Sequence, residues 1–137
     1  MLRLSNLADY AVVAMARMAN LDHRTSAAAL SEETGIPAPT TAKLTKILAK
    51  EGLLDATRGA TGGVALSRAP EDIRLTDIIE AVDGPIGLTQ CLHEGAEDCA
   101  LGSTCRVKPH FALINSRVRD ALADVTLADL AKTKEPA

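Results

Sequence analysis

The chain has 137 residues and a formal net charge of −3, with 47% hydrophobic and 24% charged residues. These proportions are typical of a folded globular domain and exclude a disordered tail. Only two aromatic residues, Tyr10 and Phe111, are present, so stacking on single-stranded nucleic acid is excluded as a main activity. No apolar run is long enough to span a membrane, and the first residues lack a secretion signal pattern. We therefore expect a cytoplasmic protein.

The first fifty residues predict three helices in succession. An apolar stripe at helical spacing runs over 5–20. Ser26 is suited to cap a second helix over 27–34, which Gly35 would end. Two prolines follow and suit the entry of a third helix, expected over 40–50. The apolar face of this third helix is expected to contain Leu44, Ile47 and Leu48.

Two short strands are expected next, over 53–57 and 64–67, joined by a glycine-rich turn at 58–63. The order of helix, helix, tight turn, helix and hairpin is that of a winged helix-turn-helix. The sequence therefore predicts a mainly α fold with a small β-hairpin wing.

The second half of the chain predicts a helix over 76–82, an irregular segment over 88–106 and a long amphipathic helix over 109–123. The long helix carries Phe111, Ile114, Val118 and Leu122 in line. A short last helix is expected from Thr126. We divide the chain into a winged DNA-binding domain (1–84), a cysteine-rich loop (85–108), and a dimerisation helix with a C-terminal tail (109–137).

Basic residues gather in one part of the chain. Residues 37–70 hold five basic and two acidic residues, a local charge of +3 in a chain of −3. A recognition helix reads base edges with its first turns, while its lysines reach phosphates. The expected double-stranded DNA contacts are Thr40, Thr41, Lys43, Lys46 and Arg58, with Gly59, Gly62 and Gly63 allowing a close backbone approach. The alternative is a solvated lysine face beside an ordinary hairpin.

All three cysteines, Cys91, Cys99 and Cys105, lie within 15 residues. Thiolates are soft ligands that suit iron–sulfur clusters and zinc, and the spacing is not that of paired zinc-ribbon cysteines. Composition alone leaves three alternatives open: an iron–sulfur cluster, a zinc ion, or three buried or surplus cysteines that bind no metal. His93 and His110 are conceivable further ligands, although a lone histidine is more often a surface residue.

No catalytic constellation is present, and no phosphate-binding glycine motif. Cys105 and His110 could be drawn as a nucleophile and its base, but nothing nearby suggests an oxyanion hole. We therefore expect no enzyme and no small-molecule substrate.

Four stretches together resemble the Rrf2 family of bacterial transcription regulators. They are the opening at 4–11, the turn and helix at 35–54, the wing at 58–66, and the run at 78–85. The three cysteines follow at the family's place. The run at 84–91 is most similar to the branch that regulates the SUF iron–sulfur assembly operon.

The resemblance implies a homodimer that crosses its long helices, binds operator DNA, and holds a 4Fe–4S or 2Fe–2S cluster in each cysteine loop. In some members an acidic residue from the partner's first helix completes the ligand set, and Asp9 matches that position. Lys108 stands where other members have a histidine ligand. In the third helix, Ala42 and Lys43 replace a Glu-Gln pair of the family, so the operator sequence should differ. A nitric oxide or redox sensor on the same scaffold, and a zinc-stapled DNA-binding module, are the alternative readings.

Overall fold

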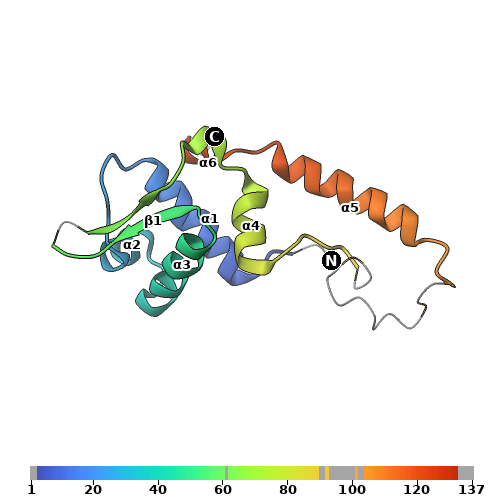
Figure 1. The fold of residues 1–137 in the computed structure, drawn as a ribbon, viewed down its shortest axis with the longest axis horizontal. Helices are drawn as coiled ribbons and strands as arrows, with labels where there is room; N and C mark the ends of the chain where they lie inside the picture. The colour runs from blue at the N-terminus through green and yellow to red at the C-terminus, as the bar shows by residue number, and fades with distance from the viewer. Residues whose placement is uncertain (1–2, 61, 90–91, 93–100, 102–103, 133–137) are drawn as a thin grey trace.

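The computed structural model describes residues 3–60, 62–89, 92, 101 and 104–132. Three helices come first, followed by a two-stranded hairpin, a single 3-10 turn and three more helices (Figure 1). In chain order they are α1 (Asn6–Ala19), α2 (Ala27–Thr34), α3 (Ala38–Lys50), β1 (Leu54–Thr57), β2 (Gly63–Leu66), η1 (Pro70–Asp72), α4 (Leu75–Asp83), α5 (Lys108–Ala123) and α6 (Leu127–Ala131). The mainly α winged-helix fold predicted from the sequence is confirmed.

The helix ends follow from their capping residues. The Ser5 hydroxyl accepts the Ala8 amide, and the Ser26 hydroxyl accepts the Ala29 amide, both at 3.0 Å. Gly35 ends α2 in the left-handed conformation, at φ +80°. Side-chain caps satisfy amides that a helix cannot pair internally, and glycine adopts a positive φ without a steric penalty.

The wing is an antiparallel hairpin in which Leu54 pairs with Leu66 and Thr57 with Gly63. Its second strand is also bridged to the α1–α2 loop, because Val64 and Thr25 exchange two main-chain hydrogen bonds of 2.7 and 3.0 Å. A two-stranded hairpin alone is marginally stable, so this third segment anchors the base of the wing.

One hydrophobic core joins the first four helices to the last. Its fully buried side chains include Met15, Leu30, Leu44, Leu48, Ile73, Ile78 and Leu127. Leu127 belongs to α6, which packs on α1 and η1, and its amide donates to the Ile73 carbonyl at 2.8 Å. The chain therefore leaves the winged domain after α4 and returns to complete its core at α6.

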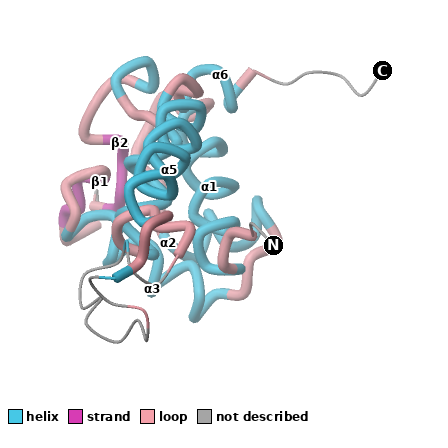
Figure 2. The backbone as a smooth tube through the Cα atoms, turned by 90° about the vertical axis from the view of Figure 1, so that its right-hand side faces the viewer, coloured by secondary structure: helices cyan, strands magenta, loops and turns pink. Residues whose placement is uncertain are grey.

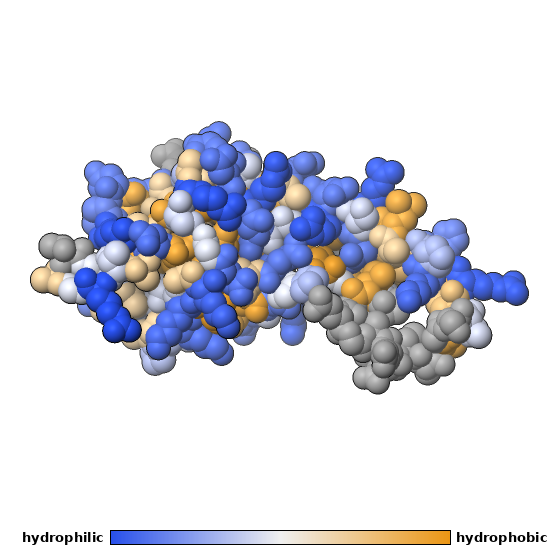
Figure 3. Space-filling view, viewed as in Figure 1, coloured by the Kyte–Doolittle hydropathy of each residue, from blue (hydrophilic) through white to orange (hydrophobic). Residues whose placement is uncertain are grey.

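The helix α5 projects away from this core (Figure 1). None of its residues is buried, and Leu113 and Ile114 are 57% and 48% exposed. Figure 3 shows hydrophobic residues on the surface at this end of the molecule. Within the described ranges, no helix is both long enough and apolar enough to cross a membrane.

Candidate nucleic-acid interface and cysteine segment

The turn between α2 and α3 is fixed by hydroxyl groups that bind main-chain carbonyls. Ser31 donates to the Ile36 carbonyl at 2.6 Å, and Ile36 itself is buried. Pro37 precedes α3 and makes no side-chain cap hydrogen bond. The Ser31 hydrogen bond stabilises the turn that joins the two helices of the helix-turn-helix.

Thr41 does not lie where we expected it. Its side chain is completely buried, and its hydroxyl donates to the carbonyls of Ile36 and Pro37 at 3.4 and 3.2 Å. A buried hydroxyl satisfied by the backbone cannot reach DNA, so Thr41 is a residue of the turn and not a candidate contact. Thr40, one position earlier, is partly exposed.

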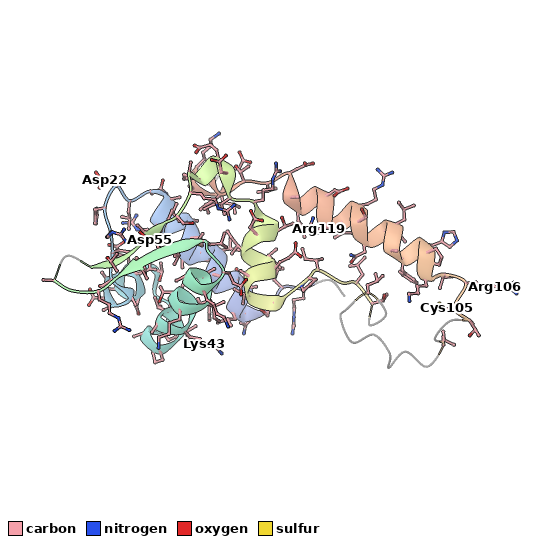
Figure 4. All side chains as sticks on the ribbon, in the orientation of Figure 1. Asp22, Lys43, Asp55, Cys105, Arg106 and Arg119 are labelled. Atoms are coloured by element: carbon pink, nitrogen blue, oxygen red, sulfur yellow. The ribbon has the colours of Figure 1, made fainter. Side chains whose placement is uncertain are left out.

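The lysines of α3 occupy the face opposite its core contacts. Lys43, Lys46 and Lys50 are exposed, whereas Leu44 and Leu48 are fully buried. None of the ion pairs found among the described residues involves these lysines. Lys43 points away from the body of the domain (Figure 4). The recognition helix thus presents unneutralised positive charge to solvent.

The wing carries a second exposed cation, Arg58, directly after β1. Asp55 in β1 is paired with Arg24 of the α1–α2 loop at 2.5 Å. The acidic side chain of the hairpin is therefore neutralised from within the protein, which leaves Arg58 as the uncompensated charge.

The three glycines of the wing are required for different structural reasons. Gly59 lies in the exposed turn at φ +105° with open space around it. A Cβ on Gly62 would lie 2.5 Å from the Thr57 carbonyl oxygen, and one on Gly63, at φ +138°, would lie 2.5 Å from that of Thr25. Gly62 and Gly63 therefore accommodate the protein's own backbone, whereas Gly59 is open to an approaching ligand.

The cysteine segment is described in part. Cys105 is an unpaired, partly exposed thiol just before α5, while Cys91, Cys99 and His93 lie outside the described residues. Figure 4 places Cys105 at the end of α5 that is remote from Lys43. Asp9 is exposed in the first turn of α1. Among the residues that the structure describes, no three His, Cys, Asp or Glu side chains gather as a metal site.

The structure also shows contacts that the sequence did not reveal. Asn115 of α5 binds the main chain of Ile86 and Leu88, each at 2.9 Å. Arg119, one helical turn later, pairs with Glu80 of α4 at 2.6 Å. The four-residue spacing of Asn115 and Arg119 was a readable signal, because it places two polar side chains on one face of an otherwise amphipathic helix.

The Rrf2 family model, described as an iron-dependent transcriptional regulator, matches residues 4–133. The chain belongs to the Rrf2 family. It is 33% identical over 136 residues to the HTH-type transcriptional regulator IscR of Erwinia tasmaniensis, covering 98% of this chain and 81% of that protein.

Two solved structures agree with this assignment. CymR, the global cysteine regulator of B. subtilis, superimposes with a TM-score of 0.75 at 27% identity, over 98% of this chain and all of that one. IscR of T. potens superimposes with a TM-score of 0.70 at 26% identity, over 98% and 94% of the two chains. The chain is thus a DNA-binding transcription regulator of the Rrf2 type and not an enzyme.

Proposed function

We propose that this regulator senses iron–sulfur status through Cys91, Cys99 and Cys105. The observation that carries the proposal is the placing of all three thiols in one 15-residue stretch without Lys or Arg, directly before α5 of an Rrf2-family chain. Thiolates are the usual ligands of iron–sulfur clusters. The donor set therefore fits a cluster of 4Fe–4S or 2Fe–2S type.

A fourth ligand is needed, and we assign it to Asp9 of the partner subunit. Asp9 is exposed at the N-terminal end of α1, so its carboxylate is available to another chain. A carboxylate is a harder ligand than a thiolate and so binds iron less firmly, which suits a site that must lose its cluster in response to a signal. The cluster would hold the three thiolates together, and its loss would release the segment.

The homodimer in this proposal forms through α5. The helix leaves Phe111, Leu113 and Ile114 exposed, and no other part of the described chain covers them. Two-fold pairing would bury these side chains and present two recognition helices to the two half-sites of an operator. Figure 2, seen from the end at which α5 projects, shows α3 at the opposite side of the domain from α6.

Operator contact is assigned to Thr40, Lys43 and Lys46 of α3 in the major groove, and to Arg58 with Gly59 of the wing. The lysines are supported by their exposure and by the lack of an ion-pair partner among the described residues, and Arg58 is supported by the internal neutralisation of Asp55. We place the regulator in the cytoplasm and its target genes in iron–sulfur assembly of the SUF type.

Purification without oxygen, followed by native mass spectrometry and an absorption spectrum, tests the proposal. A dimer that carries iron and sulfide, and loses both in Cys99→Ala, is the expected result. A dimer that contains zinc or no metal, and still binds DNA, would overturn the cluster proposal. Reaction of a loaded cluster with nitric oxide at lower doses than those of iron chelators would move the assignment to a nitric oxide sensor.

A further inference from the structure

Three positions of α5, each about one helical turn from the next, make polar contacts with the preceding part of the chain. The Asn115 side-chain amide donates to the Ile86 carbonyl and accepts from the Leu88 amide. Arg119 pairs with Glu80 of α4, and the Ala123 carbonyl accepts from Arg74 at 2.7 Å. Positions four apart lie on the same face of a helix, so these contacts form a polar seam that joins α5 first to residues 86 and 88 and then to Glu80 and Arg74 of the winged domain.

The apolar contacts beside this seam are incomplete. Val118 and Leu122 are only partly buried, and with Ile79 and Ile86 they line an open surface pocket of about 390 Å³ beside the 84–88 segment. On the side of this pocket, the segment is not held by close packing. The two hydrogen bonds to Asn115 are directional contacts that fix Ile86 and Leu88 on α5.

The contacts of Asn115 and Arg119 connect two separate parts of the chain. Leu88 precedes Cys91 by three residues, so Asn115 holds the entry of the cysteine segment. One turn along α5, Arg119 holds Glu80, a residue of the helix that packs on α1 and α3. Cys105 and Lys43 lie far apart (Figure 4), so a signal within one chain needs such a connection.

We infer that Asn115 is a positioning residue that couples the cysteine segment to α4 and so to the DNA-binding domain. The inference rests on the proposed function, because it requires the state of the thiols to displace the segment. A primary amide suits the task, since it pairs with a donor and an acceptor two residues apart and fixes the register of the segment. Aspartate would keep only the contact with the Leu88 amide, and leucine would keep neither.

Hydrogen exchange of the metal-free protein is the first measurement. Asn115→Leu removes both hydrogen bonds while retaining a side chain of similar size. We expect amide exchange in 85–89 to become about threefold to tenfold faster, as the loss of one net hydrogen bond implies, and exchange in α4 to rise with it. Asn115→Asp is expected to keep the Leu88 amide slow. Ser116→Ala, an exposed neighbour on α5, is the matched control and should leave both regions unchanged.

Operator affinity is the second measurement, with DNA selected in vitro by the wild-type protein. The ratio of affinities between iron-loaded and metal-free protein should fall towards one in Asn115→Leu, at wild-type iron content and melting temperature. A purely structural role would lower the melting temperature and leave that ratio intact. Unchanged exchange in 85–89, or a retained ratio, would overturn the inference.

The two proposals fail in different ways. A wild-type protein that takes up no iron, or binds DNA equally in both states, contradicts the proposed function. Exchange in α4 of the metal-free Asn115→Leu protein then still decides the coupling, because an effect confined to 85–89 would show that the anchor transmits nothing.

Discussion

The guanidinium of Arg24 donates to both the carboxylate and the main-chain carbonyl of Asp55, at 2.5 and 3.1 Å. The contact joins the α1–α2 loop to the first wing strand across 31 positions of sequence. An exposed ion pair of this kind contributes little to stability. Its effect is electrostatic. Arg24 neutralises Asp55, the acidic residue of the hairpin, so the charge of Arg58 makes the wing positive.

Replacing Arg58 should weaken operator binding. Arg58→Ala removes the uncompensated cation of the wing, and we expect a loss of about tenfold in affinity, typical of one charged hydrogen bond. Fluorescence anisotropy with labelled operator measures it. Lys132→Ala is the charge-matched control, because Lys132 follows α6 on the side of the domain away from α3 (Figure 2). Equal affinity of the two variants would remove the wing from the interface.

Lys46 should act through phosphate. We expect Lys46→Ala to reduce the slope of log affinity against log salt concentration by about one unit, because one fewer counterion is released on binding. A titration series at several salt concentrations gives the slope. A lower affinity with an unchanged slope would place Lys46 outside the phosphate contacts.

Gly63 should be costly to replace. In Gly63→Ala the new Cβ would meet the Thr25 carbonyl oxygen at 2.5 Å, and φ is +138°. Backbone strain alone costs about 1–3 kcal/mol, and the clash at the Thr25–Val64 bridge adds to it. Gly52→Ala is the control, because Gly52 has φ +82° but open space around it and should lose only about 1 kcal/mol. Urea unfolding measures the free energy of unfolding of both variants. Equal losses would show that the Thr25–Val64 bridge shifts to accommodate the new Cβ at little cost.

The start of α6 should make stability depend on pH. The Asp129 carboxylate accepts the Thr126 amide at 3.0 Å, and hydrogen bonding from the Thr126 backbone and then from its side chain lowers the pKa of Asp129 below its ordinary 3.8. A carboxyl with a lowered folded-state pKa stabilises the fold at pH values above 3.8, and this contribution is lost as the pH falls through the folded-state pKa. Asp129→Asn should therefore be less stable than wild type at pH 7 and equal to it in strong acid. A difference that persists in acid would assign the effect to shape and not to charge.

Ile114 should govern assembly and not folding. It is 48% exposed in the single chain, and no residue of α5 is buried there. We expect Ile114→Asp to yield a folded monomer in sedimentation experiments, because a charge would enter the proposed apolar interface. Arg117→Asp, also exposed on α5, is the charge control. A dimer that survives Ile114→Asp would move the interface away from this face.

Local signals in the sequence were sufficient for most of the elements. Ser26 and Gly35 bracket α2 at its observed ends, and the glycines at 59–63 mark the wing, because caps and turns depend on the residues that make them. The burial of Thr41 was not readable, since its hydroxyl is satisfied by main-chain carbonyls that only the folded turn brings near. Helical periodicity also identified α5 as amphipathic, but it does not say whether its apolar face meets the same chain or another.

The return of α6 to the winged domain has a consequence for the order of events after synthesis. Leu127 completes the core between α1 and η1, and it emerges from the ribosome after the cysteines and after the whole of α5. A growing chain therefore exposes its three cysteines and the apolar face of α5 while the DNA-binding domain is still incomplete. We therefore expect stable operator binding only after α6 has been synthesised, when the cysteine segment and α5 are already complete.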